Sequence, residues 1–305
     1  MHSMIAAPAA AAVGMNDTLL PGQTLSPASG STPEIDLAAA NALLGRGFTF
    51  DIDPASGSTI TLDRQLDAVG IGGLSLTIDG NGATLEGAGL YNGLFVCAGN
   101  VTIDDLTIAS ATVSGGAGSD GGPNQGVCGF GGGRGGTGGP LSYGGGPGAG
   151  GDIFVQQGGS LVIEGGSLGS GTVSGGDAGT STFGHNGTAG GGYGGDIFIE
   201  GTSQTISLAA SGGQVLTIWG QIADQDGAYK SIGSSIPTGS SGDGTPYSGT
   251  GSLLLSGGGT IGLFASNTLP ATRHRVGRRH DPGDFRRQCA RLRLVDAGER
   301  HRATG

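Results

Sequence analysis

Short runs in which apolar residues alternate with serine or threonine recur along the chain from Phe48 onward. They cover residues 48–52, 59–62, 74–78, 101–103, 106–108, 160–163, 205–208, 215–218, 252–255 and 260–261. Alternation with a period of two is typical of β-strands that bury one face. Gly, Asn and Asp separate the runs, and these residues favour turns. Only 35–44, between Pro33 and Gly45, has a pattern compatible with a helix. The pattern therefore predicts an all-β protein.

The spacing between similar runs predicts how the strands stack. The tetrapeptide Leu76-Thr-Ile-Asp79 returns 25 residues later as Val101-Thr-Ile-Asp104. A displacement of roughly 20 to 25 residues is what one turn of a solenoid needs. Stacked turns would place Ile78 beside Ile103 at the strand spacing of roughly 4.8 Å. A β-sandwich would instead show turn signals every ~8–12 residues without this register.

The pentapeptide Gly-Gly-Asp-Ile-Phe occurs twice, at 150–154 and at 194–198. Its aspartates lie 196 − 152 = 44 residues apart, which fits two turns of a solenoid or one turn carrying a long glycine loop. We expect Ile153 and Ile197 to point inward from the two strands. The aspartates of these turns are expected to accept backbone N–H bonds rather than to bind metal. They are Asp79, Asp104, Asp152 and Asp196.

Glycine is concentrated in the middle of the chain. It supplies 70 of the 305 residues, and 36 of these lie within 115–195. Glycine tolerates tight turns and close backbone approach. We expect ordered strands at Asp152–Ile163 and Asp196–Leu208, with flexible loops before them. Aromatic residues in this region could grip sugars or pin the loops onto the solenoid, and we favour pinning. They are Phe130, Tyr143, Phe183 and Tyr193.

Charge divides the chain into an acidic body and a basic tail. Residues 1–270 carry 20 acidic and 4 basic side chains, and 271–305 carry 4 acidic side chains and 10 arginines. The balances of −16 and +6 sum to the net charge of −10. An acidic body argues against nucleic-acid binding, although the tail alone could be read as a nucleic-acid-binding arm. No apolar run is long enough for a membrane-spanning helix, and no complete secretion signal is visible.

Two segments carry a resemblance to known families. Ser75-Leu-Thr-Ile-Asp-Gly-Asn-Gly-Ala-Thr-Leu-Glu-Gly87, followed by 100–108, resembles the right-handed parallel β-helix of pectin-lyase-like proteins. Residues 251–268 resemble the strand repeat associated with bacterial autotransporter passenger domains, and 219–227 resembles the segment that leads into that repeat. Together the resemblances cover roughly Thr59–Thr268 and indicate architecture more specifically than activity.

The resemblance implies an all-β fold, a right-handed parallel β-helix with long glycine-rich loops. It also implies a fragment of a surface-exposed or secreted passenger that acts in adhesion or surface structure without catalysis. Its location would be the cell surface, the outer membrane or the medium. Its partner would be a host or neighbouring-cell surface, with carbohydrate among the candidates. We expect no cofactor and no nucleic acid.

The resemblance also suggests a division of the chain. Residues 1–47 would be a partly disordered or capping N-terminal segment, and 48–268 the β-helix, with glycine-rich loops at 115–195. Residues 269–305 would be a basic, disordered tail. The family pattern breaks after Thr268. If the codons of residues 280–294 are read one base later, codon choices compatible with this sequence encode a passenger-type strand and turn. We therefore expect a frameshift near Leu269, with a natural basic tail as the alternative, and the barrel of an autotransporter is not seen.

An enzyme on the same solenoid is the rival hypothesis. β-helix hydrolases of polygalacturonic acid resemble one another in paired carboxylates, a Gly-His-Gly and an Arg-x-Lys. The carboxylates are paired because one acts as an acid while the other activates water. This chain offers Asp104-Asp105 and His185, and it has no Arg-x-Lys. Asp105 is more simply a turn residue. The alternative function is therefore a polysaccharide lyase or glycoside hydrolase, and a low-complexity glycine-rich wall protein is a third hypothesis.

Metal and disulfide chemistry have weak signals. Residues 115–120 match the start of a calcium-binding nonapeptide in a single copy, and a solvated loop is the default interpretation. Cys97 and Cys128 could pair in an oxidising compartment or remain two thiols, and Cys289 lies in the tail. We therefore assign no catalytic, cofactor-binding or metal-binding residue from the sequence.

Overall fold

All the named elements of the described structure are β-strands. The computed structural model describes residues 24–25, 50–52, 56–62, 65–66, 68–117, 146–169, 171–180, 189–226, 249–269, 275–276 and 293–296. Within these ranges no helix has the length and apolar character needed to cross a membrane. The helix expected at 35–44 lies outside the described residues. The prediction of an all-β protein is confirmed for the described part.

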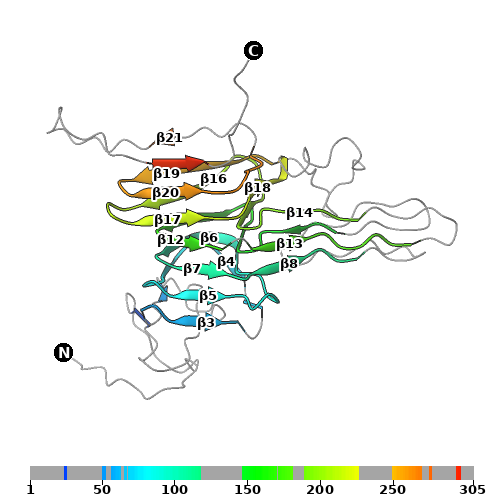
Figure 1. Cartoon of the computed structure of the whole chain (residues 1–305), viewed down its shortest axis with the longest axis horizontal. Helices are drawn as coiled ribbons and strands as arrows, with labels where there is room; N and C mark the ends of the chain where they lie inside the picture. The colour runs from blue at the N-terminus through cyan, green and yellow to red at the C-terminus, as the bar shows by residue number, and fades with distance from the viewer. Residues whose placement is uncertain are drawn as a thin grey trace, which may run out of the picture.

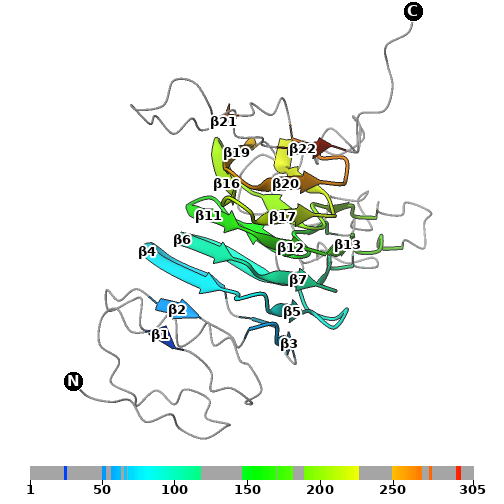
Figure 2. The same ribbon diagram turned by 60° about the vertical axis from the view of Figure 1, so that its left-hand side comes forward.

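Two parallel sheets run through the molecule (Figure 1). The first has the order β1 (Thr24–Leu25), β2 (Phe50–Ile52), β4 (Val69–Asp79), β6 (Leu94–Asp104), β11 (Gly159–Glu164), β16 (Gln204–Ala210), β19 (Gly251–Gly257), β21 (Arg275–Val276). The second has the order β3 (Thr59–Thr61), β5 (Thr84–Glu86), β7 (Thr107–Ala109), β12 (Gly166–Leu168), β17 (Val215–Ile218), β20 (Thr260–Leu263), β22 (Arg293–Asp296). The chain alternates between the sheets, adding one strand to each (Figure 2). We call each such pair of strands a repeat.

A third set of strands lies beside the first sheet. It consists of β10 (Ile153–Val155), β15 (Ile197–Ile199), β18 (Ile222–Asp224) and the N-terminal part of β6, all paired in parallel. Two small parallel pairs continue from it. They are β8 (Thr112–Ser114) with β13 (Thr172–Ser174), and β9 (Gly148–Ala149) with β14 (Gly192–Tyr193). The strands expected at Asp152–Ile163 and Asp196–Leu208 are present, but each is divided in two, as β10 with β11 and β15 with β16. The other additional strands (β8, β9, β13, β14 and β18) were not predicted, because each is only two or three residues long.

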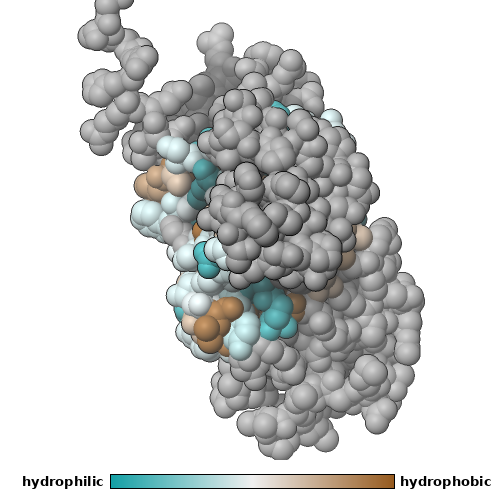
Figure 3. Space-filling view, turned by 90° about the vertical axis from the view of Figure 1, so that its right-hand side faces the viewer, coloured by the Kyte–Doolittle hydropathy of each residue, from teal (hydrophilic) through white to brown (hydrophobic). Residues whose placement is uncertain are grey.

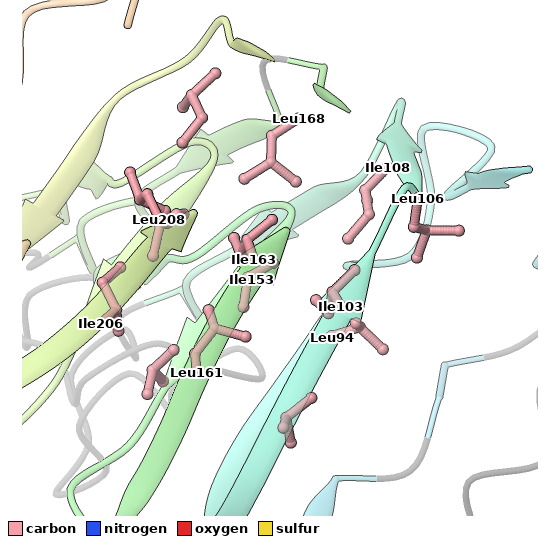
Figure 4. Close-up of a cluster of buried hydrophobic side chains, with 14 of the residues drawn as sticks. Leu94, Ile103, Leu106, Ile108, Ile153, Leu161, Ile163, Leu168, Ile206 and Leu208 are labelled. Atoms are coloured by element: carbon pink, nitrogen blue, oxygen red, sulfur yellow. The ribbon is translucent and has the colours of Figure 1, made fainter. Parts of the chain in front are cut away.

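Aliphatic side chains form continuous columns between the sheets. In the first sheet the register aligns Ile78, Ile103, Ile163, Leu208 and Leu255 in adjacent strands. All are at most 1% exposed, and Figure 4 shows members of this cluster pointing into the same interior. Such alignment repeats the same apolar contact in each repeat, so the core grows with every strand added. The predicted neighbours Ile78 and Ile103 are confirmed.

The two Gly-Gly-Asp-Ile-Phe segments lie side by side. Ile153 pairs with Ile197 and Phe154 with Phe198, so the 44 residues between the aspartates correspond to one repeat with a long excursion. Both isoleucines are fully buried in the main core, as expected. Between the two segments the chain runs through β11, β12 and β13 and then leaves the described residues at 181–188.

A second apolar cluster lies on the opposite side of β10 and β15. Phe154 stacks on Phe198 with ring centroids 5.4 Å apart, and Phe95 lies 4.9 Å from Phe154. Tyr193, only 8% exposed, packs in the same cluster. It lies in β14, at the end of a glycine-rich segment, so it holds this segment against β15 as the pinning interpretation expects. Phe130, Tyr143 and Phe183 lie outside the described residues.

Glycine-rich stems connect neighbouring repeats beyond β8, β13 and β14. The amide of Gly146 donates to the carbonyl of Gly116 (2.7 Å), Gly176 donates to Gly146 (2.8 Å) and Gly190 donates to Gly176 (2.9 Å). A Cβ on Gly115 would overlap the carbonyl oxygen of Gly146. Glycine is therefore required here because adjacent backbones approach more closely than side chains permit.

The division of the chain into three segments remains a prediction. From the N-terminal segment, β1 pairs with β2. From the basic tail, β21 pairs with β19 and β22 pairs with β20. From the same tail, Leu269 packs against the main core. The remaining residues of both segments, and residues 118–145 of the glycine-rich region, lie outside the described ranges.

Candidate functional site

Carboxylates gather at the C-terminal ends of β4, β6 and β11. The register aligns Asp79 with Asp104 and Asp104 with Glu164. Asp79 is exposed, whereas Asp104 and Glu164 are half-buried. The row arises because each strand ends at the same position in successive repeats, where a polar residue meets solvent. Like charges at strand spacing repel one another, so one member of such a row tends to hold a proton.

Asp104 is the member of this row whose acidity changes. Partial burial raises the pKa of Asp104 above its usual value, and the nearby charge of Asp79 raises it further. A hydrogen bond from the Gln214 side chain opposes this rise by stabilising the ionised form. A carboxyl group with a raised pKa beside other carboxylates can act as a general acid.

Asp105 occupies a turn, as expected. Its φ of 46° lies in the left-handed region, which aspartate adopts more readily than most residues. Its amide donates to the carbonyl of Glu164 (2.9 Å) and its carbonyl accepts from Gly82 (2.8 Å). The structure therefore brings Asp104 and Asp105 together with Asp79, while His185 lies outside the described residues. The catalytic pairing with His185 remains untested.

Two aspartates of the repeated pentapeptide are completely buried. Asp152 and Asp196 are both 0% exposed. The Asp152 Oδ2 atom accepts the Gly169 amide (3.0 Å). Asp196 accepts the amide of Gly220 on Oδ2 (2.6 Å) and that of Gly171 on Oδ1 (3.2 Å). Each carboxylate thus ties the start of a third-set strand to the chain leaving the second sheet.

Burial has a direct effect on the acidity of Asp152. Its pKa is raised well above its usual value, first by desolvation and then by the neighbouring Asp196 carboxyl. Backbone amides of Gly169 and Gly171 act in the opposite direction. Burial beside a second carboxyl in the adjacent repeat therefore favours the protonated form of Asp152. Because neither side chain reaches the surface, the pair cannot contact a substrate.

A third buried aspartate was missed by the sequence analysis. Asp224 is fully buried at the end of β18, where the register places it beside Ile199. Its Oδ2 atom accepts the Gly251 amide (2.7 Å) at the start of β19. The expectation that aspartates accept backbone N–H bonds is confirmed for Asp152 and Asp196. It is also confirmed for Asp79, whose Oδ1 accepts the Asn81 amide (3.2 Å). The only sequence signal for Asp224 was its place in a short apolar run.

The metal and disulfide hypotheses gain no support. Within the ranges that the structure describes, no three His, Cys, Asp or Glu side chains come together as metal ligands could. The calcium motif extends to Asp120, beyond the described residues. Cys97 is half-buried in β6, whereas Cys128 and Cys289 lie outside the described ranges, so the predicted alternatives for Cys97 stay open.

Comparison with known proteins gives no family assignment. No protein-family model matches the chain, no curated protein matches it, and no solved structure matches it.

Proposed function

We propose that the alternating strands form a right-handed parallel β-helix. Three observations support this: every strand pair in the described ranges is parallel, the chain alternates between two sheets, and the same aliphatic columns continue across the repeats. A crossover between parallel strands of one sheet is right-handed in about 98% of cases. A crystal structure of the chain tests this proposal, and left-handed winding would overturn it.

We propose that this β-helix is part of a surface-exposed or secreted autotransporter-type passenger and acts in adhesion or surface structure without catalysis. The observation that best supports this proposal is that the buried carboxylates accept backbone hydrogen bonds. Asp152, Asp196 and Asp224 are fully buried and bind backbone amides, so they stabilise the stack instead of facing a substrate. The stacked parallel strands of the two sheets offer a continuous outer face, which suits contact with another surface.

Surface display tests the adhesion proposal. The intact chain is fused ahead of a bacterial autotransporter barrel, and cells displaying it are compared with cells displaying an unrelated β-helix of the same length. We expect the displaying cells to adhere to epithelial cells or to one another more strongly than the controls. Equal adherence of both strains to all surfaces and to one another would overturn the proposal.

An enzyme remains the second candidate, because Asp104 has a raised pKa beside Asp79 and Asp105. A protonated Asp104 could donate a proton to a glycosidic oxygen while a neighbouring carboxylate activates water. This hypothesis predicts that the purified chain releases reducing ends from polygalacturonate or a neutral polysaccharide. It also predicts that Asp104→Asn abolishes the release. No release by the parent chain would exclude the hypothesis for those polymers.

A further inference from the structure

An exposed pair of aromatic side chains stands at the ends of β17 and β20. Trp219 and Phe264 are 51% and 38% exposed and directly follow the aligned residues Ile218 and Leu263. Their ring centroids are 4.4 Å apart, with 22° between the ring planes. Single exposed apolar residues are common on protein surfaces, whereas adjacent exposed aromatic residues often mark a contact site. Figure 3 shows one face of the molecule, on which the coloured hydrophobic residues form separate spots.

The short distance between centroids fixes how the two rings stand. Rings lying flat beside each other on the sheet would overlap at 4.4 Å, so the rings must face each other and stand on edge. The separation is close to the strand spacing of about 4.8 Å. A Cβ on Gly262 would lie 2.7 Å from Cε2 of Phe264, so glycine there leaves room for the ring. The flat ring faces therefore point along the direction in which strands stack.

The second face of the Trp219 ring has no large neighbour in the adjoining strands. The register of β12 and β17 pairs Leu168 with Ile218, and the Trp219 amide donates to the Leu168 carbonyl (3.2 Å), so the next residue, Gly169, lies beside Trp219. On the other side, the Gly169 amide donates to the Ile108 carbonyl (2.8 Å), which continues the register of β7 and β12 and places Ala109 beside Gly169. Neither residue has a side chain long enough to cover the indole. With Phe264 on one face and Gly169 beside the other, we infer that the exposed half of Trp219 includes the face above Gly169, where another ring can bind.

A row of hydroxyl side chains runs beside this space. The residues two positions before Trp219, Gly169 and Ala109 lie on the same outer face of the second sheet and are aligned from strand to strand with others of their kind. They are Thr59, Thr84, Thr107, Ser167 and Thr217. Their neighbours Leu85, Ile108 and Ile218 are fully buried, so alternation directs the hydroxyls outward. The row offers hydrogen-bond donors and acceptors at each strand.

We propose that Trp219 and Phe264, together with this hydroxyl row, form a binding site for a neutral polysaccharide. The C–H bonds on the face of a sugar ring are complementary to the negative face of an indole, and the sugar hydroxyls can bond to Ser167 and Thr217. The balance of −16 over residues 1–270 opposes nucleic acids and anionic polysaccharides. This proposal rests on the proposed adhesion function, because it names the chemical class of the partner that is bound.

Trp219 is the only tryptophan in the chain, so its fluorescence reports directly on the site. The intact chain is titrated with neutral hexasaccharides of glucose, mannose and xylose. We expect a saturable change in emission with at least one of them, and no change with oligogalacturonate. Phe264→Ala should weaken binding by about tenfold, since the stack that orients the indole is lost. Val215→Ala is the matched control, because Val215 is 55% exposed on the same strand.

Trp219→Ala is tested separately by co-sedimentation with insoluble glucan, mannan and xylan, after circular dichroism has confirmed that the chain is folded. Loss of sedimentation supports the site. The proposal is overturned if no neutral sugar changes the emission, or if Trp219→Ala sediments like the parent. An emission change that depends on protein concentration alone would also overturn the proposal, because it would indicate that Trp219 and Phe264 form a contact between two copies of the chain. Adhesion by a chain that binds no sugar would leave the proposed function intact.

Discussion

The carboxyl group of Asp152 is held in an environment where its neutral form is favoured. Its pKa is raised by burial and by Asp196. In the unfolded chain the same group ionises near its ordinary pKa of 3.8. As the pH rises from that value through the raised folded pKa, the unfolded state loses its proton first. The contribution of Asp152 to the free energy of unfolding therefore falls as the pH rises.

The variant Asp152→Asn should not show this loss, because an amide does not ionise and its oxygen can still accept the Gly169 amide. We expect the free energy of unfolding of the variant to increase relative to the parent between pH 4 and pH 8. Urea unfolding at both pH values measures this. Asp177→Asn, at an exposed position, is the control. A gap between parent and Asp152→Asn that is independent of pH would contradict the prediction.

Gly93 shows how tightly neighbouring repeats are packed. A Cβ on this buried residue would overlap the backbone carbonyl oxygen of Asp152. Gly93→Ala should therefore lower the free energy of unfolding by about 1–3 kcal/mol, the usual cost of overpacking. At Gly212 a Cβ would meet no atom within 4 Å, so Gly212→Ala should leave stability unchanged or raise it by up to about 1 kcal/mol. Equal effects of the two substitutions in chemical denaturation would refute this account.

The aligned columns make each interior aliphatic residue part of a contact with two neighbouring repeats. Ile103 lies between Ile78 and Ile163 in the first sheet. Truncation to alanine would leave a cavity at a site with 1% exposure, so Ile103→Ala should cost about 2–5 kcal/mol. Leu90→Ala, at a position with 72% exposure, should change stability by less than about 0.5 kcal/mol. Thermal and urea unfolding measure both, and similar values would argue against the columns.

The sequence predicted most of the longer strands that alternate cleanly, and it missed several strands of two or three residues, such as β5 and β8. The pattern at 215–218 became β17, with Leu216 and Ile218 buried. The run at 101–103 became only the end of β6, which begins at Leu94. The alternation breaks at Ala98 and Gly99, where φ of Gly99 is 82°, so the periodicity could not show one continuous strand.

The candidate site was less predictable than the strands. Turn roles for the aspartates follow from residue type, but burial depends on which chain segment covers them. Asp152 is covered because Gly169 and Gly171 return to it from later in the chain. The Trp219–Phe264 pair was likewise invisible, because the two residues are 45 positions apart and meet only through the register of β17 and β20.

The whole molecule is a stack in which each repeat contacts the next, so stability should vary along it. Among the described strands, β3 is the last of its sheet and pairs with β5 alone, whereas β7 pairs with both β5 and β12. Local opening should therefore be easier at β3. Amide hydrogen exchange measured by mass spectrometry should show faster exchange at 59–61 than at 107–109. Equal protection of both strands would indicate a single cooperative unit.

The hydrogen-bonded glycine stems have a consequence for protein engineering. Because Gly146 donates to Gly116 (2.7 Å), the chain leaves and re-enters the stack at positions one hydrogen bond apart. The stack therefore does not depend on the length of the peptide between them, and closing a longer loop costs only about 0.6 kcal/mol for each doubling. Foreign peptides grafted between Gly116 and Gly146 would be presented from a fixed base, which makes the stem a natural insertion point for displayed epitopes.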